Sequence, residues 1–326
     1  MMKIYGNAEV ISALENMTAQ KKTVQTVLFF GEKGTGKKTL AQYYIHLLMC
    51  ENRQDGKPCF KCRACRNVAD GIHPDVMKVE KSGKLGGISV ETARKICLEA
   101  FIKPNNADKK VYLLEDCNNI DVRTQNTLLK IIEEPPEYAY FIFTAESKSK
   151  FLDTVISRCM CLGVSPCSES DCCNALSEFG FSSEQVESAV NCFHGNIGMC
   201  KDFLADEKLR ENIRLTKSMA DSIINKDEYM LNLDFYGLGK ERENIKLSLT
   251  LLDKLIRDAV VLNYDKNAEL IGCYPEGARL LADMVTINSG DKVHQCIENA
   301  RQAIDSNVNI LLVITALCGE ICSILF

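Results

Sequence analysis

The chain has 326 residues, enough for two or three domains, and 46% of them are apolar, which excludes a globally disordered chain. The formal net charge of −5 argues against a protein that binds nucleic acid over its whole surface, although it allows a local basic patch. The 17 cysteines mostly stand singly in apolar runs, and no signal peptide is visible, so we expect free thiols and a cytoplasmic protein.

The first half of the chain predicts strands that alternate with helices. This pattern indicates a parallel sheet covered on both faces, so we expect an α/β domain over residues 1–165. Apolar, β-branched and aromatic runs predict the strands, at residues 23–31, 75–80, 109–116, 139–146 and 160–164. Helical spacing predicts the helices, at residues 8–20, 39–50, 88–102, 122–136 and 152–159.

The second half predicts helices only. Residues 166–208 contain three short helical segments separated by Gly or Ser breaks, and residues 209–326 contain longer ones. We therefore expect a small helical domain followed by a helical C-terminal domain. The last segment, residues 309–326, is apolar, but it carries Glu320 and is short for a membrane span, so a helix that faces the core or another subunit is favoured.

A glycine-rich stretch at residues 31–39 follows a predicted strand and precedes a predicted helix, as a phosphate-binding loop does. Gly31, Gly34 and Gly36 would let backbone N–H groups approach phosphate oxygens at the N-terminus of the helix. Lys37 is expected to reach the β- and γ-phosphates. A glycine-rich turn without a ligand is the alternative.

Two departures argue against efficient hydrolysis at this loop. The loop pattern asks for a hydroxyl that holds Mg²⁺, but Lys38 stands at that position and Thr39 comes one residue late. The predicted strand at 109–116 ends in Glu115 and Asp116, whereas such enzymes carry Asp and then Glu. The shorter carboxylate then stands where water is activated, and an ångström-scale misplacement costs about 10²-fold in rate. A capped turn after a strand is the alternative reading of the acidic pair.

Cys50, Cys59, Cys62 and Cys65 form a tightly spaced group with the pattern C-x8-C-x2-C-x2-C. Two x2 steps on a turn-rich basic loop let four thiolates converge on Zn²⁺. Four cysteines leave no open coordination position, so we expect a structural zinc module over residues 50–66. A disulfide pair and an iron–sulfur cluster remain as alternatives.

Arg158 follows the predicted strand at 139–146, in the sequence Ser-Arg-Cys. Thr144 on that strand is expected near the γ-phosphate of the chain's own site. A lone arginine is most often a solvated residue or an ion-pair partner. Its position here favours an outward-facing guanidinium that stabilises phosphoryl charge at the site of a neighbouring subunit.

These pieces, taken in this order, resemble the bacterial clamp-loader subunits of DNA polymerase III. The most specific parts are Asn-Thr-Leu-Leu-Lys-Ile-Ile-Glu-Glu-Pro-Pro at residues 126–136 and Ser-Arg-Cys at residues 157–159. Residues 300–317 also look like the last helices of the family, so the resemblance covers nearly the whole chain. It implies an AAA+ phosphate-loop domain with a zinc module, a small three-helix lid domain and an all-α collar domain that assembles a ring.

Within the family, the sequence is closer to the delta-prime type than to the gamma/tau motor type. Three departures point this way: Lys38, the reversed acid pair, and Gly198 where the nucleotide-sensing arginine of the lid is expected. The resemblance permits ATP or ADP at the loop, while Lys38 argues against Mg²⁺ and leaves little or no ATPase activity of the chain's own.

The resemblance also implies partners. A hetero-pentamer with gamma/tau and delta subunits would load the sliding clamp onto primer–template DNA during replication, as part of the DNA-directed DNA polymerase, and Arg158 would act on the ATP of the adjacent motor. An ATPase-active motor subunit is one alternative. A zinc-dependent DNA-binding module unrelated to replication is another.

Overall fold

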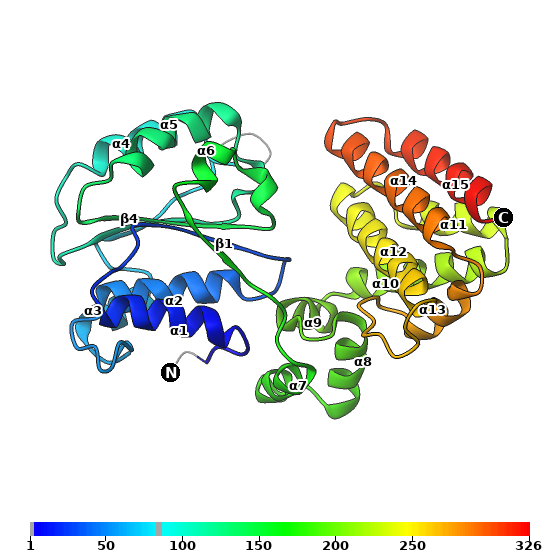
Figure 1. Ribbon diagram of the computed structural model, residues 1–326, viewed down its shortest axis with the longest axis horizontal. Coiled ribbons are helices and arrows are strands. Elements are labelled where there is room, and N and C mark those ends of the chain that lie inside the picture. Colours follow the sequence, from blue (N-terminus) through cyan, green and yellow to red (C-terminus); the bar gives the residue numbers. More distant parts are fainter. Residues whose placement is uncertain (1–2, 83–86) are drawn as a thin grey trace. The chain divides into compact units, whose positions relative to one another are not determined.

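The computed structural model describes residues 3–82 and 87–326, and the chain divides into two compact units at residues 1–171 and 172–326 (Figure 1). The first unit is α/β. The described residues of the second unit contain helices and no strand. The predicted fold class, a parallel α/β domain followed by helical domains, is confirmed.

A five-stranded sheet forms the centre of the first unit, in the order β2-β3-β4-β1-β5, and all its pairings are parallel. This order inserts β4 between β1 and β3. The residues that follow β1 and β3 therefore meet at one edge of the sheet, on either side of the end of β4. The strands are β1 (Thr26–Phe30), β2 (Val76–Lys78), β3 (Lys110–Leu114), β4 (Ala139–Ala145) and β5 (Met160–Gly163).

Helices cover both faces of the sheet, as parallel strands with crossover connections require (Figure 1). One face carries α1 (Ala8–Ala19), α2 (Lys37–Met49) and α3 (Arg63–Ala69). The other carries α4 (Val90–Glu99), α5 (Val122–Glu133) and α6 (Asp153–Ile156). Among the described residues, short 3₁₀ turns lie at Cys117–Asn119 and Lys148–Lys150.

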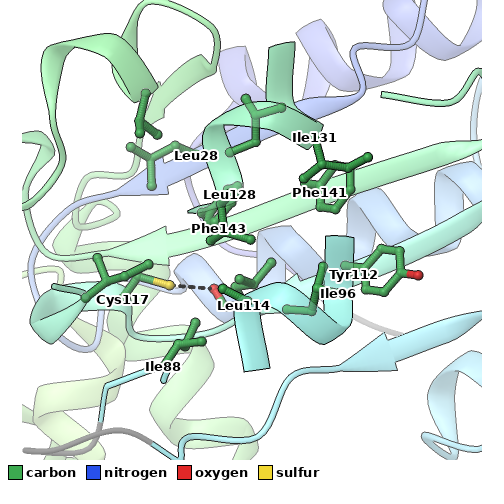
Figure 2. Close-up of a cluster of buried hydrophobic side chains, with 14 of the residues drawn as sticks. Leu28, Ile88, Ile96, Tyr112, Leu114, Cys117, Leu128, Ile131, Phe141 and Phe143 are labelled. Atoms are coloured by element: carbon green, nitrogen blue, oxygen red, sulfur yellow. Dashed lines mark hydrogen bonds between the residues drawn. The ribbon is translucent and has the colours of Figure 1, made fainter. Parts of the chain in front are cut away.

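The core under α4 and α5 is built from the apolar side chains of β3 and β4 (Figure 2). Every residue of both strands is buried, as expected for a parallel sheet whose two faces are both covered by helices. The rings of Tyr112 and Phe141 stack with centroids 5.3 Å apart. Cys117 closes the cluster, because its thiol donates to the carbonyl oxygen of Leu114 at 3.3 Å.

Capping residues fix where several helices begin. Ser89 accepts from the backbone N–H of Thr92 at 3.2 Å, so α4, predicted from residue 88, begins at Val90. The segment predicted only as a cysteine-bearing loop contains α3, whose N-cap is Cys62. In the second unit, α14 begins at Ile287, because Thr286 and Ser289 form a capping box there.

The second unit consists of short helices followed by longer ones, as the sequence predicts. Among its described residues no helix has both the length and the apolar character that a membrane crossing requires. The predicted lid–collar boundary at residue 208 falls in the first turn of α10, and the division into these two domains stays a prediction. The helices are α7 (Glu169–Glu178), α8 (Ser183–Phe193), α9 (Ile197–Ala205), α10 (Glu207–Ile224), α11 (Glu228–Gly237), α12 (Arg242–Leu262), α13 (Pro275–Ala282), α14 (Ile287–Asp305) and α15 (Ile310–Leu325).

The stacked ring of Phe141 provides a test of the core. Phe141→Ala leaves a cavity at a fully buried position of β4 and should lower the free energy of unfolding of the first unit by about 3–5 kcal/mol. Hydrogen exchange at the amides of β3 and β4 measures the loss. Phe101→Ala is the matched control, since that ring is 66% exposed and should cost less than about 0.5 kcal/mol. Equal losses in the two variants would contradict this assignment of the core.

Candidate functional site

The glycine loop joins the end of β1 to the start of α2. Gly34 and Gly36 adopt φ values of 86° and 95°, in the left-handed region that favours glycine. A Cβ at Gly31 would lie 2.1 Å from the carbonyl oxygen of Val164, so the close approach of the chain after β5 leaves no space for a side chain. Gly36 is the N-cap of α2, and the loop therefore delivers the chain to a helix N-terminus, the arrangement that suits an anion.

Lys37 folds back over this loop. Its Nζ donates to the carbonyl oxygens of Gly31 and Glu32, at 2.7 Å in each case, and the side chain is buried. Burial lowers the pKa of Lys37, while the charges of Glu146 and Asp116 work in the opposite direction. An ammonium group thus lies against the loop backbone, where it can meet a phosphate bound by the loop.

Lys38 carries its ammonium group to the acids that follow β3. Its Nζ lies 2.6 Å from Asp116 Oδ2 and 3.9 Å from Glu115 Oε2. Lys78 approaches Glu115 at 2.7 Å, and Lys81 approaches Asp116 at 3.3 Å. Three ammonium groups therefore surround the two carboxylates.

The electrostatics of this cluster keep Lys38 and Asp116 charged at neutral pH. Partial burial acts to raise the pKa of Asp116, but the hydrogen bond and charge of Lys38, helped by Lys81, bring that pKa below its usual value. Burial acts to lower the pKa of Lys38, but the hydrogen bond to Asp116 and the charges of both acids raise it. Mg²⁺ needs oxygen ligands in near-ideal octahedral geometry. Carboxylates already engaged by ammonium groups are poor candidates for that role.

Thr144 is the second-last residue of β4, the strand that lies between β1 and β3. The residue is fully buried, and its Oγ1 accepts a hydrogen bond from the backbone N–H of Asp116 at 2.8 Å. Asp116 adopts φ 51°, a left-handed conformation uncommon outside glycine, and this bond helps to hold it. Thr39 lies half-buried in the first turn of α2.

The sequence did not point to Lys78 and Lys81 as members of this site. Both lie at or just after the end of β2, which pairs with β3 so that Lys78 stands opposite Leu113. This register places the two lysines beside Glu115 and Asp116. Only the pairing of β2 with β3 shows that these lysines lie beside the acids, and no motif along the chain indicates it.

The four cysteines of residues 50–66 converge. Their Sγ atoms all lie within 4.8 Å of one another, and those of Cys50 and Cys59 are 3.5 Å apart. Tetrahedral Zn²⁺ with Zn–S bonds of about 2.3 Å requires sulfur–sulfur edges of about 3.8 Å. The four cysteines are free, and 3.5 Å is far beyond a disulfide bond length of about 2.05 Å. The cluster could hold one structural zinc ion.

Backbone N–H groups point at the sulfur atoms. Cys59 Sγ accepts from the N–H groups of Lys61 at 3.5 Å and Cys62 at 3.3 Å, and Cys62 Sγ accepts from Cys65 at 3.4 Å. The bonds from Lys61 and Cys62 lower the pKa of Cys59 to about 6. A metal ion binds the thiolate form, so these donors favour the ligand state of that cysteine.

The cysteine cluster is packed onto the helix that starts at the glycine loop. Cys50 directly follows α2, and Phe60 turns back to place its ring 5.1 Å from that of His46 and 6.2 Å from that of Tyr43, both on α2. The cluster thereby packs at the C-terminal end of α2, and the glycine loop leads into the N-terminal end of the same helix.

Arg158 lies at the surface of the first unit, after α6. Its guanidinium is 2.8 Å from Glu133 Oε1 on α5 and donates to the carbonyl oxygen of Thr154 at 2.8 Å. The two charged side chains are 39% and 45% exposed. Within the described residues, the polar contacts of Arg158 are with α5, α6 and the adjoining Ser157, and none is with the glycine loop. Gly198 lies in the first turn of α9, in the second unit.

Comparison with known proteins identifies relatives of the first unit. Residues 6–168, half of the 326-residue chain, match the family model described as DNA polymerase III, delta subunit. The chain is 31% identical over 156 residues to DNA polymerase III subunit tau of Bacillus subtilis, covering 48% of this chain and 27% of that protein. It is 30% identical over 174 residues to subunit gamma of Buchnera aphidicola subsp. Schizaphis graminum, covering 53% of this chain and 47% of that protein. The chain thus spans less than half the length of these curated relatives.

Among solved structures, a gamma subunit-related protein of Thermotoga maritima aligns over 95% of this chain and 98% of its own, with a TM-score of 0.41 and 14% identity. The clamp loader delta protein of Bacillus subtilis aligns over 96% of this chain and 99% of its own, with a TM-score of 0.35 and 10% identity. These values are too low to add to the sequence match. Because the family model matches half of the chain, the chain belongs to the DNA polymerase III, delta subunit family, the clamp-loader subunits that its sequence resembles.

Proposed function

We propose that this protein is a clamp-loader subunit of the delta-prime type. Its glycine loop holds a nucleotide without efficient hydrolysis, and Arg158 acts on the ATP of a neighbouring motor subunit. The observation that carries the proposal is the 2.6 Å contact between Lys38 Nζ and Asp116 Oδ2, which puts an ammonium group where a hydrolytic site holds Mg²⁺.

The consequence for catalysis follows from charge. In phosphoryl transfer, Mg²⁺ bridges the β- and γ-phosphate oxygens and neutralises the charge that develops on them. A lysine brings one positive charge to this place, which favours bound phosphates, but it has no coordination sites with which to organise an attacking water. Lys38 therefore supports nucleotide binding and opposes turnover.

The position of Arg158 supports a role toward a partner. An exposed ion pair contributes at most about 1 kcal/mol to stability. Moving the guanidinium of Arg158 from Glu133 to a stronger anion therefore costs little free energy. A triphosphate at the transition state is such an anion, and an arginine supplied in trans accelerates phosphoryl transfer by about 10³–10⁵-fold.

Family membership supports the remaining parts of the proposal. We place the chain in a hetero-pentamer with gamma/tau motor subunits and delta, joined by the helical C-terminal domains. This complex loads the sliding clamp onto primer–template DNA in the cytoplasm. Zn²⁺ at Cys50, Cys59, Cys62 and Cys65 has a structural role, since four protein ligands leave no position for a substrate.

An ATPase-active motor subunit of the same loader is the second candidate. Gly31, Gly34, Gly36 and Lys37 are present in a loop geometry that suits phosphates, and the curated relatives named above are tau and gamma subunits. This reading requires that the loop binds Mg²⁺–ATP despite Lys38.

ATP turnover separates the two candidates. The purified chain should hydrolyse ATP no faster than its Lys37→Ala variant, because the acids are engaged by lysines and not by Mg²⁺. Phosphate release measured by a coupled assay checks this. A rate of about 1 s⁻¹ or more that disappears in Lys37→Ala would favour the motor reading.

The role of Arg158 is tested in the assembled loader. Arg158→Ala should lower the DNA-stimulated ATPase rate of the motor subunit that it faces by about 10³-fold, with the mass of the complex unchanged. Glu133→Ala is the matched control, because it removes only the intramolecular partner and should preserve the rate. An unchanged rate in a complex that contains Arg158→Ala would refute the trans-acting role.

The metal is tested by elemental analysis of the purified chain. We expect one zinc ion per chain, and its loss in Cys62→Ser, since three thiolates and a hydroxyl no longer match the site. The unfolding midpoint of the first unit should fall with the metal. Cys97→Ser, at a half-buried thiol of α4 outside the cluster, is the control and should retain the ion. Zinc-free protein with an unaltered midpoint would argue against a structural metal.

A further inference from the structure

A polar cavity of about 450 Å³ lies beside the cysteine cluster, away from the residues of the glycine loop. It is enclosed by the end of α2, by α3 and by the segment that leads into β3. Its size is in the range of small-molecule sites, which are usually mostly apolar. Its lining is instead rich in charged and amide groups, including Arg53, Arg63, Asn67, His73, Asn106 and Lys109.

Buried hydrogen bonds fix one wall of this cavity. Asp75 is fully buried, and its carboxylate accepts from the backbone N–H groups of Asn105, Asn106 and Ala107 at 2.5, 2.8 and 3.0 Å. His73, which lines the cavity, accepts at Nδ1 from the N–H of Asp75 at 3.2 Å. The segment that carries Lys109 is therefore held in place by the fold.

Three cationic residues belong to the lining, and in the described part of the chain none of them has a carboxylate partner; the Nζ of Lys109 lies 5.8 Å from the centre of the Tyr140 ring. Within residues 3–82 and 87–326, no ion pair within 4.0 Å involves Arg53, Arg63 or Lys109, although Glu51 and Asp108 also belong to the lining. Arg53 instead donates to the carbonyl oxygen of Leu47 at 2.7 Å. Burial and the positive charge of Arg53 lower the pKa of Lys109, and the negative charge of Asp108 only partly offsets this. Arg53 and Lys109 thus lie close enough for their charges to act on each other, an arrangement that an anion would stabilise.

We propose that this cavity binds a phosphate group, held by Arg53, Arg63 and Lys109 and carried either by a nucleic-acid backbone or by a free nucleotide. Guanidinium groups match the oxygen pairs of phosphate, and the amides of Asn67 and Asn106 supply further donors. The site is separate from the glycine loop, so it does not depend on the function proposed above.

A purely structural role for the same cations makes a different prediction. Four thiolates and one Zn²⁺ carry a net charge of −2, and Cys50 also lines the cavity. If Arg53, Arg63 and Lys109 only offset that charge, their removal should release zinc and leave phosphate binding unchanged.

Lys109→Gln in the full chain is the deciding variant, because Lys109 lies outside the cysteine segment. Anisotropy of a fluorescein-labelled oligothymidylate, and calorimetry with pyrophosphate, measure the two sources of phosphate. We expect affinity to fall about tenfold for at least one probe, with zinc content unchanged. For the oligonucleotide, the slope of log K against log salt should also fall by about 1. Lys103→Gln, an exposed lysine of the same segment outside the cavity lining, is the control and should behave as the wild type.

The results of these measurements distinguish a nucleic-acid site, a site for a free ligand and a purely structural role of the cations. A loss for the oligonucleotide assigns the site to nucleic acid, and a loss for pyrophosphate alone assigns it to a free ligand. Binding of neither probe, equal binding by Lys109→Gln and wild type, or an equal loss in Lys103→Gln would overturn the proposal. Arg63→Lys should weaken binding of the probe that binds but keep the zinc, because lysine preserves the charge and loses the paired donors of the guanidinium. Zinc release with unchanged phosphate affinity would favour the structural role.

Discussion

One ion pair, between Lys38 at the start of α2 and Asp116 after β3, governs what this site can do. This ion pair links the start of α2 to the acids after β3. In a hydrolytic phosphate-loop site, Mg²⁺ links the same two segments. Lys81 and Lys78 complete the neutralisation of the acids. The glycine loop has the backbone geometry that suits phosphates, so the proposed loss of hydrolysis arises at the metal position and not at the loop. The proposed division of labour, in which a neighbouring subunit hydrolyses ATP, follows from this substitution.

The architecture links this site to the cysteine cluster through α2. The helix starts directly after Gly36 of the glycine loop and ends directly before Cys50, the first cysteine of the cluster. The ring of Phe60 packs on the same helix near its end. The cysteine segment therefore packs against one end of the helix whose other end follows the glycine loop. The polar cavity is also lined by this end of α2, so the cluster lies next to the helix that both proposed sites share.

The sequence predicts the elements of the first unit well because its central strands β1, β3 and β4 are almost entirely buried and are written as largely apolar runs. The convergence of the four cysteines was equally predictable, since their short spacing leaves few other geometries. Non-local contacts were not predictable. The contributions of Lys78 and Lys81 depend on the register of β2 against β3, and the pairing of Arg158 with Glu133 depends on how α6 follows α5 in space. Such contacts join residues far apart in the chain, and no local pattern records them.

The most direct test of the account is the Mg²⁺ dependence of nucleotide binding. Equilibrium binding of a fluorescent ATP analogue should be compared in Mg²⁺ and in EDTA, for the wild-type chain and for Lys38→Thr. The account predicts that the wild-type Kd changes by less than about twofold, whereas Lys38→Thr binds about tenfold more tightly when Mg²⁺ is present. Wild-type binding that requires Mg²⁺, or no nucleotide binding at all, would contradict the claim that Lys38 replaces the metal ion.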